Sequence, residues 1–182
     1  MSGAVNQVLA DQTFLAWGLA RSRLVGLSQE EFAWEPVAGC WSLRRTEEVT
    51  GVVPAGRQWW LDGDGIEAPE PPPFTTVAWL VGHMTLAVWN YNDTIAGIPA
   101  TPEPALPELA GPAVELWGEV IERFETMVKA FDDPQLADPV EVWGGTATRA
   151  FVISHVVGEV LHHAAEVGRL RDLYRIRSQW GS

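Results

Sequence analysis

Three of the four histidines stand close together near the C-terminal end of the chain, and two carboxylates lie among them. The segment reads SHVVGEVLHHAAEVGRL, and its titratable side chains include His155, Glu159, His162, His163 and Glu166. On an α-helix, which turns about 100° per residue, these five share a stripe about 100° wide. Glu159 and His163 are four residues apart, so both side chains can point at one ion. A Glu and a His at this spacing are also common on exposed helix faces.

The remaining histidine, His83, lies in an otherwise apolar run, WLVGHMTLAVW. An imidazole in such a helix needs a partner, because burying it unpaired costs a few kcal/mol. A backbone carbonyl of the core is one candidate partner. The other is a metal ion, because metal sites in helix bundles form from inward side chains on facing helices. His83, Glu159 and His163 would then form a two-histidine, one-carboxylate set with open coordination positions, which is typical of catalytic rather than structural metal sites.

Four long segments with helical periodicity would position these residues. They run over about 5–26, 76–98, 113–131 and 148–174. In the first, Val8, Leu9, Leu15, Leu19 and Leu24 fall close to one stripe, as in an amphipathic helix. In the third, the residues expected to face inward are Val114, Trp117, Val120, Ile121, Phe124 and Val128.

Helix-capping, irregular and proline-rich segments separate these helices. Ser28 and Glu31 form a capping-box pattern that opens a short helix, SQEEFAW. An irregular segment over 35–73 follows, with Trp41, Trp59 and Trp60 as its expected anchors. A proline-rich crossover over 99–112 joins the second and third helices, and EVWGG before the last helix suggests a short extended piece. We therefore expect an all-α fold, a four-helix bundle in which residues 1–182 form one domain.

The composition excludes several classes of protein. A net charge of −12 argues against nucleic-acid binding, which needs a basic surface. The basic residues Arg169, Arg171, Arg175 and Arg177 are expected to complement the carbonyls at the end of the last helix. A single cysteine, Cys40, rules out an internal disulfide and suits a small, partly buried residue better than a nucleophile. No signal peptide and no membrane span is recognised, so a cytoplasmic location is expected.

In these motifs the chain resembles the DinB-like (YfiT-like) superfamily of metal-binding four-helix bundles, in particular its actinobacterial branch. The resemblance covers nearly the whole chain and rests on GLSQEEFAWEPVAGCWSL, PPPFTTVAWLVGHM and ISHVVGEVLHHAAEVGRLRDLY. It places metal ligands at His83, Glu159 and His163. Many members carry His where this chain has Glu159, and the carboxylate keeps zinc, nickel, manganese and iron open as the divalent metal.

The resemblance implies a thiol-dependent transferase or isomerase that uses a low-molecular-weight thiol such as mycothiol. We therefore expect S-transferase-like chemistry on a small electrophile. A metal-dependent hydrolase needs the same open site, and a non-catalytic bundle that binds a small molecule or a partner stays open as a third reading. Glu166 is expected to orient a ligand imidazole, and His155 and His162 to flank the site. Trp79 and Asn90 fall near the face of His83 and are expected to line a pocket. A homodimer is also expected from the family.

Overall fold

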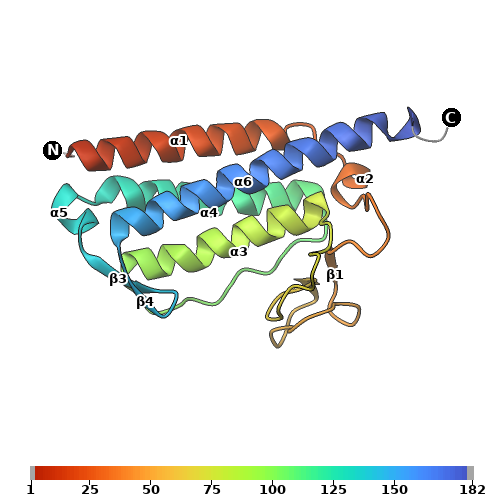
Figure 1. The fold of residues 1–182 in the computed structure, drawn as a ribbon, viewed down its shortest axis with the longest axis horizontal. Helices are drawn as coiled ribbons and strands as arrows, with labels where there is room; N and C mark the ends of the chain where they lie inside the picture. The colour runs from red at the N-terminus through yellow and green to blue at the C-terminus, as the bar shows by residue number, and fades with distance from the viewer. Residues whose placement is uncertain (1–2, 180–182) are drawn as a thin grey trace.

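The structure, a computed structural model, describes residues 3–179 and is mostly helical (Figure 1). Four long helices pack against one another: α1 contacts α4 and α6, and α3 contacts the same two helices. Their bounds are α1 Ala4–Leu24, α3 Val77–Ala96, α4 Ala110–Ala130 and α6 Arg149–Ile176. Two short helices, α2 Gln29–Phe32 and α5 Asp133–Leu136, and a closing 3₁₀ turn, η1 Arg177–Gln179, complete the helical part. The expectation of a helical protein is confirmed.

Two small antiparallel hairpins stand at the edges of this helical layer. One joins β1 Leu43–Arg45 to β2 Trp59–Leu61, and the other joins β3 Pro139–Val142 to β4 Gly145–Thr148. The second hairpin contains the EVWGG segment that the sequence suggested would be extended. Its tip has a positive φ at both Trp143 (52°) and Gly144 (73°), the conformation that suits the twist of a two-residue hairpin turn.

Side-chain oxygens cap the N-termini of most of the helices. Thr76 accepts a hydrogen bond from the N–H of Trp79, and Thr148 accepts one from Phe151. Ser28 accepts from the N–H of Glu31, so half of the expected capping box is present. The side chain of Glu31 does not return to Ser28 because it binds Arg171 instead. The helix α4 begins at Ala110, three residues earlier than expected, because Pro112 is tolerated in a first helical turn.

One large apolar core runs between the four long helices. Trp117, Val120, Ile121, Phe124 and Val128 are buried in it as the periodicity of the third segment predicted, while Val114 is only partly buried. Each of these helices contributes buried residues to the core, and α1 and α6 run side by side in the same direction (Figure 1). No helix of the described residues is both long and apolar enough to cross a membrane.

The prediction of one apolar stripe on the first helix is wrong. Leu9 and Leu24 are buried in the core, but Val8, Leu15 and Leu19 are each more than half exposed. The apolar residues of α1 therefore divide between two faces of the helix. Nothing in the described part of the chain covers the outer one fully.

The expectation for the terminal arginines fails at Arg171. Its guanidinium is buried against Glu31, and both side chains are 7% exposed. It also donates to the carbonyls of Arg23 and Val25, just where α1 ends. Arg171 therefore joins the ends of α1, α2 and α6 rather than complementing the end of its own helix.

The segment between α2 and α3 is held by its tryptophans and by one buried carboxylate. Trp60 is fully buried, and Trp41 pairs with Thr75 in an isolated bridge. Asp62, 3% exposed, accepts hydrogen bonds from the backbone of Ser42 and Thr50 and from Arg44. This network fixes the hairpin β1–β2 beside the N-terminal half of α3.

Candidate metal centre

The helices α3 and α6 bring three of the predicted residues together. His83 on α3 and Glu159 and His163 on α6 each offer a ligand atom, and these atoms all lie within 4.8 Å of one another. Nε2 of His163 is 3.6 Å from Oε2 of Glu159, and the rings of His83 and His163 are 4.9 Å apart, edge to face. All three side chains are partly buried. Two imidazoles and a carboxylate form a donor set that suits a divalent ion such as zinc, nickel, manganese or iron.

The hydrogen bond between His163 and Glu166 determines which nitrogen of His163 can bind a metal. Nδ1 of His163 lies 2.7 Å from Oε2 of Glu166. An ionised carboxylate only accepts hydrogen bonds, so the proton of the neutral imidazole lies on Nδ1 and the lone pair on Nε2. Nε2 is the atom that faces Glu159. The same hydrogen bond lowers the pKa of Glu166, which keeps this carboxylate ionised.

His83 is held neutral and fixed in orientation. Burial, followed by the neighbouring charge of His163, lowers the pKa of His83 to about 4. Its ring therefore keeps a lone pair at neutral pH. The ring of Trp79 stacks on it with centroids 4.7 Å apart, and the indole N–H of Trp79 donates to the carbonyl of Asp62. Trp79 thus contacts His83 through a stack that the helical spacing alone did not specify.

Each of the two other histidines of α6 lies near one of the helix's carboxylates. Nε2 of His155 is 3.9 Å from Oε1 of Glu159, and the side chain is one third exposed. His162 is 67% exposed and lies 3.5 Å from Glu166. Among the described residues, His162, His163 and Glu166 form a second group close enough to hold an ion, but two of its members are exposed. The group that includes His83 is better shielded from water.

Asn90 does not join the site, contrary to expectation. It is exposed, and its amide donates to Glu103 in the crossover between α3 and α4. Helical spacing placed Asn90 on the side of His83, but it did not reveal that the crossover passes there. The competing hydrogen bond turns the side chain away.

Sequence reasoning missed an aromatic cluster beside His155. The rings of Tyr91 and Trp143 lie 5.5 Å and 4.8 Å from the His155 ring, and the indole N–H of Trp143 donates to the hydroxyl of Tyr91. Trp143 comes from the tip of the β3–β4 hairpin. The pair Gly144 and Gly145 signalled a tight turn, but no pattern in the sequence shows which helix that turn lies against.

The single cysteine, Cys40, is buried and has no role in the candidate site. Cys40 is 2% exposed, and its thiol donates to the carbonyl of Val37. Burial raises the pKa of this thiol, so it is a poor nucleophile.

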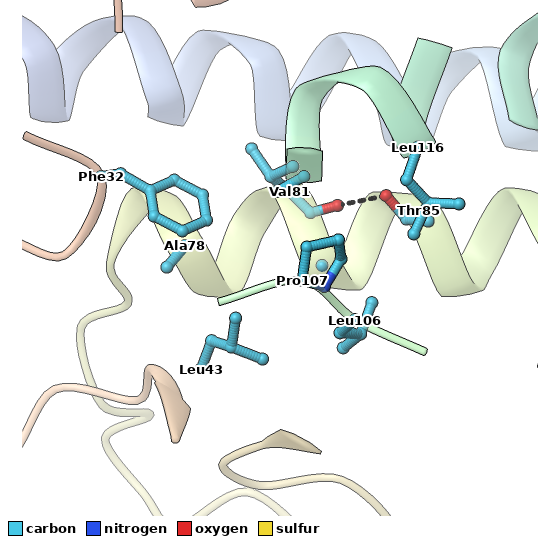
Figure 2. Close-up of a pocket in the computed structure, with 10 residues that line it drawn as sticks. Phe32, Leu43, Ala78, Val81, Thr85, Leu106, Pro107 and Leu116 are labelled. Carbon is cyan, nitrogen blue, oxygen red and sulfur yellow. Dashed lines mark hydrogen bonds between the residues drawn. The ribbon is translucent and has the colours of Figure 1, made fainter. Parts of the chain in front are cut away.

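A cavity of about 10 Å³ lies between α3, α4 and the crossover (Figure 2). Its lining is apolar except for Thr85, whose hydroxyl donates to the carbonyl of Val81. It has room for one water molecule at most and is a packing gap.

The family model described as the DinB superfamily matches residues 12–167, which include all four histidines. No curated protein and no solved structure matches the chain.

Proposed function

Because the chain belongs to the DinB superfamily, we propose that it is a metal-dependent enzyme whose ion is held between α3 and α6 by His83, Glu159 and His163. The observation that carries the proposal is the convergence of these three side chains from two helices. In this proposal the four long helices are a four-helix bundle, residues 1–182 form one domain, and the site lies in the groove between two of its helices.

The proposed reaction is the transfer of a small-molecule thiol of the mycothiol class to a small electrophile. A divalent ion with an open position lowers the pKa of a thiol that binds there. The thiol sulfur forms a bond to the electrophilic carbon, and the leaving group departs with its electron pair. The thiol's proton goes to His155, because this partly exposed imidazole lies beside Glu159 and an imidazole exchanges protons readily near neutral pH.

Two side chains support the ligands in this proposal. Glu166 fixes the tautomer of His163, and Trp79 holds the ring of His83 by stacking. Tyr91 and Trp143 provide an aromatic wall next to His155, which favours an electrophile with an apolar part. His162 lies at the exposed rim, where it contacts Glu166 and the ring of His163.

The metal is tested first, on protein purified without a histidine tag. Titration calorimetry and thermal unfolding with zinc, nickel, manganese and iron(II) should show one site per chain. His83→Ala and His163→Ala should lose the binding and the metal-dependent rise in melting temperature. His162→Ala is the matched control, because it removes an adjacent imidazole that belongs only to the second group. Loss of binding in His162→Ala but not in His83→Ala would show that the metal binds at His162, His163 and Glu166 instead, and would contradict the proposal.

The reaction is tested on the metal-loaded protein. Mycothiol or N-acetylcysteine is supplied with an activated aryl chloride, and thioether formation is followed by absorbance. Transfer that depends on the metal and falls in His155→Gln supports the proposal. Metal-dependent cleavage of a nitrophenyl ester without thiol would indicate the hydrolase instead. Metal binding with neither reaction would favour a non-catalytic binding protein.

A further inference from the structure

A groove lies beside the candidate metal centre, between the C-terminal half of α6 and the residues that precede α3. Its volume is about 330 Å³, which is within the range of small-molecule sites. Two of its lining residues, His162 and Glu166, also belong to the second group of possible metal ligands, and Glu166 is hydrogen-bonded to His163. The groove therefore begins next to the metal centre and extends away from it along α6. We call it the Phe74–α6 groove.

Apolar side chains from both sides line most of the Phe74–α6 groove. Leu170 is 8% exposed and belongs to the core, whereas Phe74 is 65% exposed. The backbone around Phe74 is fixed, because its carbonyl accepts a hydrogen bond from the N–H of Trp41 and the N–H of Thr76 donates to the carbonyl of Trp41. These walls suit the apolar part of a ligand. The apolar lining residues are Phe74, Ala165, Leu170 and Leu173.

Packed aromatic rings connect the groove to the proposed metal ligand His83. The ring of Trp41 lies 6.0 Å from that of Trp79, which in turn stacks on His83 at 4.7 Å. Trp41 also pairs with Thr75, which lines the groove. The groove wall and the metal ligand therefore hold a fixed relative position, and such fixed positions let a site orient one ligand at both ends.

Arg169 brings a positive charge to the groove and has no partner there. Of the other arginines near the end of α6, Arg171 and Arg175 each form an ion pair, and Arg177 lies over the ring of Tyr174. Arg169 is exposed and makes no ion pair, hydrogen bond or ring contact within the described part of the chain. A guanidinium presents a planar fork of donors that matches a carboxylate. Arg169 is therefore available to bind an anionic ligand.

The charges around the groove favour a ligand with a single negative charge. Because the chain has a net charge of −12, an anionic ligand needs a local cation to bind. Arg169 supplies one positive charge, and the carboxylate of Glu166 lies in the same lining. A phosphate monoester, which carries nearly two negative charges at pH 7, would face one cation and the repulsion of Glu166. A carboxylate carries one charge, and the hydroxyl of Thr75, which makes no hydrogen bond with the described residues, offers it a neutral donor.

We propose that the Phe74–α6 groove binds a carboxylate at the end of an apolar stem, with Arg169 pairing with the carboxylate and the apolar walls enclosing the stem. This inference rests on the proposed function in one respect: the ligand is part of one of the two reactants, whose reacting atom lies at the metal centre. Arg169 is six residues beyond His163, about 9 Å along the helix axis, so one small molecule can span both. The carboxylate belongs to the thiol or to the electrophile, and kinetics distinguish the two sources.

Titration calorimetry with 4-phenylbutyrate tests the groove without any reaction. The metal-free and the zinc-loaded protein should both bind it, and both should bind the neutral analogue 4-phenylbutanamide at least about tenfold more weakly. Arg169→Gln should weaken the binding of 4-phenylbutyrate by the same factor. Arg175→Gln is the matched control, because it removes an exposed arginine of the same helix that does not line the groove. It should bind like the wild type, and both variants should melt as folded proteins.

Two further variants separate the groove from the metal. Ala165→Trp, which fills the groove without changing its charge, should prevent binding of 4-phenylbutyrate. His83→Ala should bind it like the wild type, because the carboxylate is held by Arg169 and not by an ion. Equal affinity in Arg169→Gln and wild type, tighter binding of inorganic phosphate than of 4-phenylbutyrate, or binding that requires both zinc and His83 would each overturn the proposal. Because metal-free protein suffices, a failure of the proposed metal or reaction leaves this result readable.

Kinetics of thiol transfer identify the reactant that carries the carboxylate. The thiol 6-mercaptohexanoate is compared with 6-mercaptohexanamide on a neutral aryl chloride, and 3-(4-chloro-3-nitrophenyl)propionate is compared with its amide on N-acetylcysteinamide. The carboxylate reactant that occupies the groove should have a KM at least about tenfold below that of its amide in the wild type, with kcat unchanged. In Arg169→Gln the two KM values should be equal. If the wild type transfers thiols but neither pair differs in KM, the groove does not hold a reactant and the proposal is wrong.

Discussion

At the scale of single residues, Glu166 controls the candidate site without having to touch an ion. Its hydrogen bond to Nδ1 of His163 leaves Nε2 free to face Glu159 and His83. Carboxylates that orient a ligand histidine in this way raise its basicity as well as fixing its ring. The strength of a proposed ligand therefore depends on a residue three positions further along α6.

Glu166→Gln should lower the metal affinity about tenfold while leaving the fold intact. The amide oxygen can still accept from Nδ1, but it lacks the charge that strengthens the bond. Titration calorimetry with zinc or nickel measures the change. Asp172→Asn, which neutralises an exposed carboxylate on the same helix, is the control and should bind like the wild type. Equal affinities for the two variants would show that Glu166 does not support His163.

Several residue roles were predictable because they depend on one helix only. The spacing of Glu159, His163 and Glu166 follows from the helical repeat, which continues unbroken through α6. Asn90 and Trp143 were not predictable in this way. Asn90 turns to Glu103 in a crossover, and Trp143 is placed by a hairpin, so both depend on how distant segments meet.

At the scale of elements, a buried ion pair joins helices that are far apart in sequence. Arg171 and Glu31 lie 140 positions apart and bind through two hydrogen bonds of 2.7 and 3.1 Å. Removing one partner of a buried pair leaves an uncompensated charge and costs about 3–5 kcal/mol. The sequence could not reveal this pair, because Arg171 resembles any basic residue near a helix end.

Arg171→Met should therefore lower the free energy of unfolding by about 3–5 kcal/mol, measured by urea denaturation at pH 7. Arg175→Met is the control at an exposed position of the same helix and should change stability by less than about 0.5 kcal/mol. The double variant Glu31→Leu/Arg171→Met should recover much of the loss, because it leaves no unpaired charge. A double variant no more stable than Arg171→Met would refute this explanation.

Asp93 ties the crossover to both α3 and α4. It is 3% exposed and accepts hydrogen bonds from the N–H and hydroxyl of Thr101 and from Arg123. Burial alone would raise the pKa of Asp93, but these hydrogen bonds and the charge of Arg123 outweigh it and lower the pKa. The pKa of Asp93 is lower in the folded protein than in the unfolded chain. The ionised carboxylate therefore stabilises the fold at pH values above the unfolded pKa of about 3.9.

The stabilisation by Asp93 should be lost as pH falls through the folded pKa, that is, below about pH 4. Melting temperatures between pH 2.5 and pH 5 measure it. Asp93→Asn should be less stable than the wild type at pH 5, and the difference should shrink toward pH 2.5. Asp11→Asn, at an exposed position of α1, should follow the wild type throughout. A constant difference between Asp93→Asn and wild type would mean that the carboxylate's charge is unimportant.

At the scale of the whole molecule, excess negative charge sets the background for every stability measurement. The chain has 24 acidic and 12 basic residues, and the resulting self-repulsion destabilises a compact state. The apolar pattern predicted the helices in spite of this charge, because burial and periodicity are local signals. It did not predict the exposed side of α1, because apolar residues on two faces look like one broad stripe.

Salt should therefore raise the melting temperature of the metal-free protein. The Debye length falls from about 30 Å at 0.01 M to about 8 Å at 0.15 M ionic strength, so distant carboxylates cease to repel one another. The melting temperature should rise equally in sodium chloride and in potassium chloride, because screening depends on ionic strength and not on the identity of the ion. His163→Ala should show the same rise with salt and lose only the additional rise caused by zinc or nickel at constant ionic strength. If that variant lost the salt effect as well, the separation of general screening from ion binding at His83, Glu159 and His163 would be wrong.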